Sequence, residues 1–162
     1  MNEREYQAII SEHVPVLYRV ARSILQNEQD CADAVQEAIF QGWVKRAQLR
    51  DAERFRPWII RITINECRNM QRKAVRRDNA LSAAAREMQQ LEDERRTAHR
   101  QTELEAALSE MPEKYRLPLV LHYVEDYSTR AIAQLMEIPE GRLRERMRTA
   151  RKMLGRMLGH DA

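Results

Sequence analysis

One stretch of the chain, residues 72–101, contains almost no large apolar side chains, and this limits what the chain can fold into. Its only large apolar residues are Val75, Leu81, Met88 and Leu91. A segment so poor in apolar surface cannot bury a core of its own. We therefore predict two modules, residues 1–75 and 104–162, joined by a linker over residues 76–103. Because the stretch lacks Gly and Pro, the linker can be partly helical, and one long surface helix is the alternative.

The composition favours an all-α fold for both modules. Among 162 residues there are only 4 Gly and 5 Pro, and only 2 Phe, 5 Tyr and 2 Trp, which argues against a β-sandwich. No apolar stretch approaches the roughly 18 residues that span a bilayer, and the N-terminus lacks the pattern of a secretory signal. We therefore expect a cytoplasmic protein that does not insert into membranes.

The residues that usually build active sites are scattered. Cys31 and Cys67 stand far apart and suit a reducing compartment better than a disulfide framework. The four histidines form no recognisable metal motif, and no Gly-rich loop precedes a predicted helix. We expect neither a metal, nor a cofactor, nor an enzymatic active site.

The N-terminal module has the apolar spacing of three helices. The first covers residues 3–26, where Pro15 predicts a kink or a break into two pieces. Asn27 can cap the second helix, residues 47–56 are predicted to be a loop, and Pro57 suits the first turn of the third helix. The buried positions expected in the last two helices are Ala34, Val35, Ala38, Ile39 and Trp43, then Trp58, Ile59, Ile62, Cys67 and Met70.

The C-terminal module ends in a predicted helix-turn-helix. A helix from Leu104 to about Pro112 precedes one with apolar residues at Leu117, Val120, Leu121 and Val124. A short helix capped by Ser128 or Thr129 is then separated by residues 137–140 from a final helix. The apolar stripe of that last helix consists of Leu143, Met147, Ala150, Leu154 and Met157.

The charged residues are distributed unevenly. The whole chain has 28 Lys and Arg against 25 Asp and Glu, a net charge of only +3. Residues 1–77 carry 14 basic and 10 acidic side chains, residues 105–141 carry 3 and 7, and residues 142–162 carry 7 and 2. Because a field depends on local charge density, the last helix is a candidate to bind nucleic acid.

Three cations share one side of the last helix. At about 100° per residue, Arg144, Arg148 and Arg151 fall on an arc beside the apolar stripe, with Glu145 just beyond. Guanidinium groups there can fork onto guanine or neutralise phosphates, and Glu145 can accept from a cytosine amino group. The alternative is a solvated charged face without a partner.

The N-terminal module carries a second candidate surface. Aromatic, amide and basic side chains along one loop and helix can stack on unpaired bases and hold the backbone; they are Phe55, Trp58, Asn65, Arg68, Asn69, Arg72 and Lys73. Trp58 could equally be a core aromatic, and Asn65 a capping or surface amide.

These residues resemble a known family. Residues 17–22, 30–37 and Trp43, followed by residues 55–65, are similar to region 2 of the extracytoplasmic-function (ECF) sigma factors, the smallest class of the sigma-70 family. Residues 107–116, 132–141 and 150–154 resemble region 4. The match covers most of the chain in the family's order and spacing.

The resemblance implies a role for each set of residues. Asp33, Gln36 and Glu37 would dock on the β′ clamp helices of core RNA polymerase, and the polymerase β flap and an anti-sigma protein would be further partners. The −10 promoter element would be read and held open by Phe55, Trp58, Arg61, Asn65, Arg68, Asn69 and Arg72, with Asn65 near a flipped base. The −35 element would be read in the major groove by Arg142, Arg144, Glu145, Arg148 and Arg151. A cytoplasmic protein of this kind would associate with the nucleoid when bound to polymerase.

The sequence departs from the family pattern at several positions. The recognition helix begins Gly-Arg-Leu-Arg-Glu-Arg over residues 141–146, where family members usually have Gly-Thr-Val-Lys-Ser-Arg. Thr149 stands where Arg is usual, Ala131 where Glu is frequent, and Cys31 where Ala is usual. We therefore expect an atypical promoter, and we interpret Cys31 as a packing variant.

Two other functions fit parts of the pattern. One is a stand-alone helix-turn-helix regulator that binds duplex DNA without polymerase. The other is a helical adaptor whose charges serve only protein contacts. Dependence on polymerase separates the first from a sigma factor, and loss of promoter use on removal of Arg144 or Arg148 separates the second.

Overall fold

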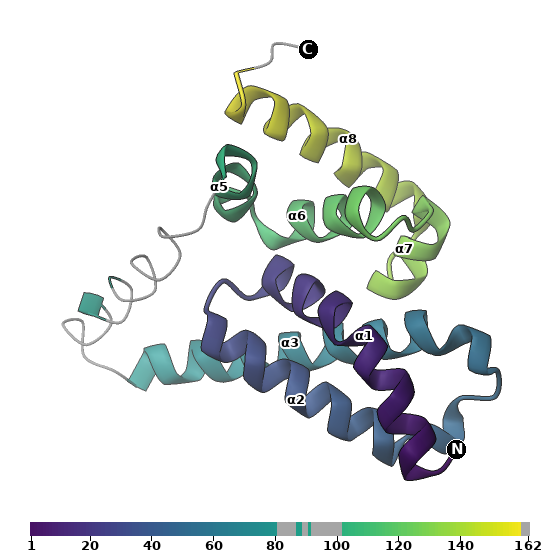
Figure 1. Ribbon diagram of the computed structural model, residues 1–162. Helices are drawn as coiled ribbons and strands as arrows, with labels where there is room; N and C mark the ends of the chain where they lie inside the picture. The colour runs from purple at the N-terminus through teal and green to yellow at the C-terminus, as the bar shows by residue number, and fades with distance from the viewer. Residues whose placement is uncertain (81–86, 89–90, 92–101, 160–162) are drawn as a thin grey trace. The chain divides into compact units, whose positions relative to one another are not determined.

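The computed structural model describes residues 1–80, 87–88, 91 and 102–159 (Figure 1). Every regular element in these ranges is helical, which confirms the all-α prediction. The contacts divide the chain into two units, Met1–Arg86 and Glu87–Ala162. Most of the predicted linker lies outside the described residues, and the module boundaries at 75 and 104 stay predictions. No helix in the described part of the chain is both long and apolar enough to cross a membrane.

Helix α1, Glu3–Ile24, runs unbroken past Pro15, so the predicted break into two pieces is wrong. Asn2 accepts a hydrogen bond from the Glu5 backbone N–H, and the Glu5 carboxylate accepts one from the Asn2 N–H. This reciprocal cap fixes the start of the helix. Pro15, which lacks the N–H that would bond to the Ser11 carbonyl, is exposed.

Helices α2 (Glu28–Val44) and α3 (Phe55–Ala80) complete the first unit, and each of its three helices packs on the other two (Figure 1). Asn27 caps α2 as predicted, accepting from the Asp30 N–H at 3.0 Å. The core is aliphatic and includes Leu17, Val20, Val35, Ile59, Ile60 and Ile64, each 0–1 % exposed. Helix α3 continues beyond residue 75 into the predicted linker.

The predicted loop over residues 47–56 contains regular structure. Two short 3-10 turns, η1 (Arg46–Gln48) and η2 (Ala52–Arg54), lie here, and α3 already begins at Phe55. Asp51 accepts from the Glu53 N–H at 3.0 Å, a local side-chain bond that favours a turn over an open loop. Pro57 lies in the first turn of α3, as predicted.

Several residues expected in the core lie only at its edge. Ile39, Trp43, Trp58 and Met70 are half-buried, whereas Ala34, Val35, Ala38, Ile59, Ile62 and Cys67 are buried as predicted. Helical spacing identifies the inward side of a helix but not how far the neighbouring helix extends over it.

In the second unit, α5 covers Glu103–Glu110 and α6 covers Glu113–Leu119. Buried Arg116 donates to the Met111 carbonyl at 2.6 Å and to the Leu108 carbonyl at 3.3 Å, at the end of α5. Burial lowers the pKa of the Arg116 guanidinium. One side chain of α6 thus donates to backbone carbonyls at the C-terminal end of α5.

A π-helical turn, η3 (Val120–Val124), continues α6. The Glu125 N–H reaches the Val120 carbonyl at 3.1 Å, five residues back. This wider turn shifts the phase of the helix, so Val124, one of the apolar residues that define this helix in the sequence, is 54 % exposed.

Helices α7, Thr129–Met136, and α8, Glu140–Met157, form the predicted helix-turn-helix (Figure 1). The Ser128 hydroxyl caps α7 by accepting from the Ala131 N–H at 3.1 Å. Glu137 adopts the left-handed conformation, with φ 57°, and ends α7. Leu143, Met147 and Ala150 are fully buried, whereas Leu154 and Met157 are half-buried. The buried side of α8 fixes which side remains exposed.

Candidate nucleic-acid interface

The predicted cationic face of α8 is exposed. The side chains of Arg144, Arg148 and Arg151 face solvent. They lie beside the fully buried Leu143 and Met147. Arg142 and Glu145 are exposed too. By helical geometry, Arg142 lies on the other flank of the apolar stripe, so the five predicted residues do not form a single cluster.

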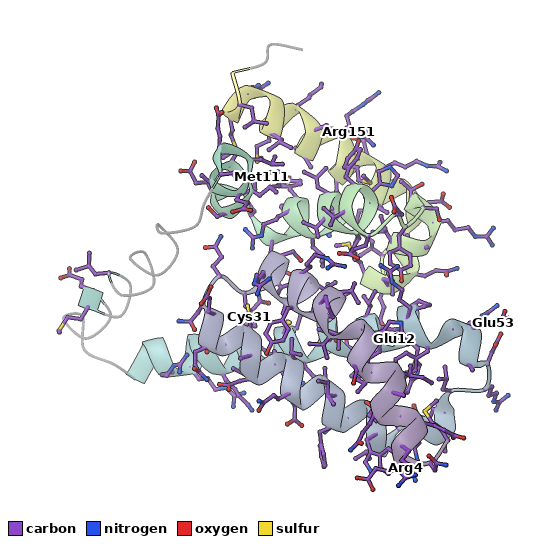
Figure 2. The ribbon with its side chains drawn as sticks, in the orientation of Figure 1. Arg4, Glu12, Cys31, Glu53, Met111 and Arg151 are labelled. Carbon is purple, nitrogen blue, oxygen red and sulfur yellow. The ribbon has the colours of Figure 1, made fainter. Side chains whose placement is uncertain are left out.

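Two of these arginines have partners within the unit. Arg144 Nη2 lies 2.8 Å from Glu140 Oε1, an exposed pair one helical turn apart. An exposed pair of this kind contributes only about 0.3–0.5 kcal/mol to stability, so a nucleic-acid ligand can displace it. Arg151, labelled in Figure 2, donates through Nε to the Tyr123 hydroxyl at 3.0 Å. Sequence reasoning missed Tyr123, because its partner lies 28 positions away.

The second candidate surface lies along α3. Exposed or half-buried side chains lie on one side of the helix, each three or four residues from another member of the set: Trp58, Arg61, Asn65, Arg68, Asn69 and Arg72. The other side is closed against the core by Ile59, Ile60 and Ile64. The helix thus brings six of the seven predicted residues onto one accessible face.

Phe55 is the exception, because it is only 3 % exposed. Its ring packs against Tyr6, His13 and Trp58, with centroid distances of 6.2, 5.1 and 5.7 Å. The structure therefore places Phe55 beneath the surface, in contact with the half-buried Trp58. A contact between Phe55 and DNA stays a prediction. The position of Phe55 allows its ring to support the Trp58 ring from beneath.

The polar end of the α3 face is internally ordered. Arg72 donates to the Asn69 side-chain oxygen, and the Asn69 amide lies 3.5 Å from a Glu66 carboxylate oxygen. Beyond it, Arg77 forms an ion pair of 3.8 Å with Asp30 at the start of α2. These contacts hold side chains one turn apart in a row along the helix.

A third exposed surface lies on α2. Asp33, Gln36 and Glu37 are exposed, and Phe40 and Val44 continue the same side of the helix at 57 % and 54 % exposure. Sequence reasoning missed Phe40 and Val44 as site residues. Phe40 follows Gln36 by four residues, and Val44 follows Phe40 by four, so both share the exposed side of the helix and not the side of the buried Ala34 and Ala38. This spacing was the signal in the sequence that could have identified them.

Cys31, labelled in Figure 2, is a core residue of α2. It is 1 % exposed, and its thiol lies 3.1 Å from the Leu25 carbonyl. Burial raises the pKa of Cys31 to about 12. A thiol that stays protonated is a poor nucleophile, which fits a packing role.

Comparison with known proteins gives two family matches. The model for sigma-70 region 2 matches residues 9–77, and the model for sigma-70, region 4 matches residues 101–154. The RNA polymerase sigma factor SigV of Bacillus subtilis is 25 % identical over 149 residues, covering 90 % of this chain and 86 % of that protein. The ECF RNA polymerase sigma factor SigM of Mycobacterium tuberculosis is 26 % identical over 161 residues, covering 96 % and 78 %.

Solved structures agree on the fold. The sigma factor RpoE of Bartonella quintana, in complex with the anti-sigma factor NepR, superposes with a TM-score of 0.76 at 17 % identity, covering 98 % of this chain and 99 % of that one. CnrH, in complex with the cytosolic domain of CnrY, gives a TM-score of 0.68 at 25 % identity, covering 99 % and 92 %.

The fold and the exposed faces define a helical nucleic-acid-binding protein with a helix-turn-helix in its second unit. With the two family matches, the chain belongs to the sigma-70 family of RNA polymerase sigma factors, and its relatives place it with the ECF class. It is a subunit that binds core RNA polymerase and directs promoter-specific initiation of transcription. The family consists of initiation factors and not of enzymes.

Proposed function

We propose that the three exposed faces divide the work of initiation among α2, α3 and α8. The observation that supports this division is common to all three helices. Each has one side closed by fully buried residues and the opposite side exposed and chemically distinct: acidic and apolar on α2, amide, aromatic and basic on α3, and arginine-rich on α8.

The α2 face docks on core polymerase. Phe40 and Val44 form an exposed apolar patch, and Asp33 and Glu37 border it with negative charge. An apolar centre with a charged rim is typical of a protein interface. The acidic rim favours a partner with basic side chains around an apolar strip, which on polymerase would be the β′ clamp helices, while the second unit meets the β flap.

The α3 face reads and holds open the −10 element. Arg61, Arg68 and Arg72 can follow the phosphates of a single strand, and the exposed Asn65 can hydrogen-bond to the edge of an unpaired base. Trp58, backed by the buried Phe55, offers the edge of an aromatic cluster on which a base can stack. Binding of an extruded base offsets the cost of melting at the matching sequence.

The α8 face reads the −35 element in the duplex. Arg144 and Arg148 can fork onto guanine edges, and Arg151 lies one turn further along, where a phosphate contact is expected. Glu145 repels phosphate and suits a base donor such as the cytosine amino group. The combination of Arg142 and Glu145 where the family usually has small residues supports an atypical −35 sequence.

We also propose that an anti-sigma protein holds the chain inactive by covering the α2 face. The exposed Phe40 and Val44 support this, because a single partner on that patch would block polymerase. The chain would act in the cytoplasm and associate with the nucleoid when bound to polymerase.

The proposal is tested by transcription with purified components. The chain and core polymerase of its source bacterium are incubated with fragments of that genome, and run-off transcripts are mapped. We expect promoter-specific transcripts only when both proteins are present. No such transcript, together with a footprint of the chain alone on duplex DNA, would favour a stand-alone helix-turn-helix regulator instead.

Substitutions on α2 test the docking face. Phe40→Ser combined with Val44→Ser should weaken core binding by about tenfold or more, because central apolar anchors dominate interface energetics. Val75→Ser is the matched control, since Val75 is an apolar residue of the same unit with a similar exposure of 59 %. Equal core binding by the double variant and the control, measured by titration of labelled polymerase, would place the docking face elsewhere.

A further inference from the structure

The hydrogen bond between Arg151 and Tyr123 joins two elements of the second unit. Arg151 Nε on α8 donates to the Tyr123 hydroxyl oxygen at the end of η3, at 3.0 Å. Tyr123 is 60 % exposed, so its hydroxyl is not used to satisfy a buried polar atom. A large aromatic side chain at the surface that bonds to a proposed DNA-binding arginine indicates a function beyond packing.

Because Arg151 donates to Tyr123 through Nε, its other N–H groups remain available to a ligand. A guanidinium has five N–H donors in a planar fork, and Nε supplies only one of them. With Nε on Tyr123, the two terminal amino groups of Arg151 stay available for a bidentate contact with phosphate. A long arginine side chain loses rotamer freedom when it binds, and a bond that already restrains it reduces this cost.

Tyr123 is itself held by its neighbours. The His122 ring packs edge-on against the Tyr123 ring, with centroids 4.8 Å apart at 80°. His122 Nδ1 lies 2.8 Å from the Tyr127 carbonyl oxygen, and because a carbonyl only accepts, Nδ1 carries the proton. Three contacts thus connect the turn before α7 to His122, His122 to Tyr123, and Tyr123 to Arg151.

We propose that Tyr123 is a positioning residue for promoter binding, which holds Arg151 in the orientation that contacts a phosphate of the −35 duplex. This inference rests on the proposed function of the α8 face. It adds a residue outside the helix-turn-helix to the determinants of −35 affinity, and it predicts that Tyr123 acts through Arg151 and not by a contact of its own.

The test uses the full chain in complex with core polymerase and a fluorescent duplex promoter obtained from the run-off mapping. Tyr123→Phe keeps the ring and removes the hydroxyl. We expect affinity to fall by about two- to tenfold, the range for one hydrogen bond. Tyr115→Phe is the matched control: Tyr115 belongs to the same unit, and its ring lies 5.0 Å from Lys114 Nζ. The control should bind as the unchanged protein does.

Salt dependence and a double-mutant cycle separate positioning from a structural role. Arg151→Ala should flatten the slope of log affinity against log salt by about 0.9, the value for one phosphate contact on duplex DNA. Tyr123→Phe should flatten it in the same direction, and should cause no further loss of affinity in the Arg151→Ala background. Additive losses, an unchanged slope, or full affinity in either single variant would overturn the inference.

Arg144→Ala and Arg148→Ala distinguish a failure of the inference on Tyr123 from a failure of the proposed function of the α8 face. If both weaken binding while Tyr123→Phe does not, the proposed role of α8 holds and the inference on Tyr123 fails. If neither they nor Arg151→Ala affects binding, the proposed role of the α8 face fails, and the inference fails with it.

Discussion

Gly42 on α2 lies against side chains of both α1 and α3. A Cβ at this position would be 2.5 Å from the Tyr6 hydroxyl oxygen and 2.7 Å from Ile59 Cδ1. The Tyr6 hydroxyl donates to the Ile39 carbonyl at 2.5 Å, so it is not free to move aside. The absence of a side chain at Gly42 therefore lets the Tyr6 and Ile59 side chains pack directly against α2.

Gly42→Ala should destabilise the protein by about 1–3 kcal/mol, the usual cost of an overpacked core. Gly141→Ala is the control, because no atom lies within 4 Å of a Cβ built there. It should instead stabilise the helix slightly, by about 0.4–1 kcal/mol. Urea denaturation followed by circular dichroism measures both, and equal effects of the two substitutions would contradict the close packing at Gly42.

Cys31 and Tyr6 give the first unit a dependence on alkaline pH. Burial raises the pKa of Cys31 from 9.0 to about 12, and that of Tyr6 from 10.0 to about 12. The folded state keeps both groups neutral, so their contribution is complete below pH 9 and is lost as the pH rises through 12. Stability should fall by about 1 kcal/mol per pH unit for each group once its unfolded form ionises.

The measurement is the free energy of unfolding at pH 7.5, 9.5 and 10.5 for the unchanged protein and for Cys31→Ala. We expect a shallower decline in the variant over the lower part of this range, since only Tyr6 then contributes there and it begins to ionise later. Parallel declines would show that the thiol is not the titrating group.

At the scale of elements, α3 combines a structural and a functional side. The buried Ile59, Ile60 and Ile64 fix the helix, and this leaves Asn65 exposed on the side proposed to hold the −10 strand. Sequence periodicity placed Ile59, Ile62 and Cys67 on the buried side, as observed, but it placed Trp58 there too, and Trp58 is half-buried. It could not show that Phe55 lies under Trp58, because the covering residues Tyr6 and His13 come from α1.

Asn65→Ala should impair a duplex promoter more than a promoter with a pre-melted −10 segment, because capture of an unpaired base is needed only when the strands must separate. Open-complex formation on the two templates, followed by permanganate footprinting, measures the difference. Arg4→Ala is a suitable control, as Arg4 is an exposed cation of the same unit that lies on α1, outside the α3 face. Equal losses on both templates for Asn65→Ala would contradict a role in melting.

The π-helical turn η3 is an element that helical spacing in the sequence could not predict. Caps such as Asn27 and Ser128 are local, and the sequence was enough to predict them. The turn η3 inserts an extra residue into the helical repeat, so regular spacing could not show that Tyr123 and Val124 are exposed. Local rules therefore predict helices and their ends better than they predict which residues face outward after an irregular turn.

For the whole molecule, the uneven charge of the sequence corresponds to separate exposed faces. A net charge of +3 conceals one amide and cationic face on α3 and one arginine-rich face on α8, each on its own unit. The division into two units followed from the apolar-poor stretch after Arg72. The exact boundaries and the form of the linker stay predictions, because few of residues 76–103 are among those described.

Buried Arg116 has a consequence for how the second unit opens. Helix α5 has eight residues, too few to be stable alone, and one guanidinium joins its last carbonyls to α6. Pulling α5 away would expose this cation's carbonyl partners together and leave a charge in an apolar setting. Separation of α5 from α6 would thus break several hydrogen bonds of one guanidinium together, so we expect this end of the second unit to open in a single step and not residue by residue.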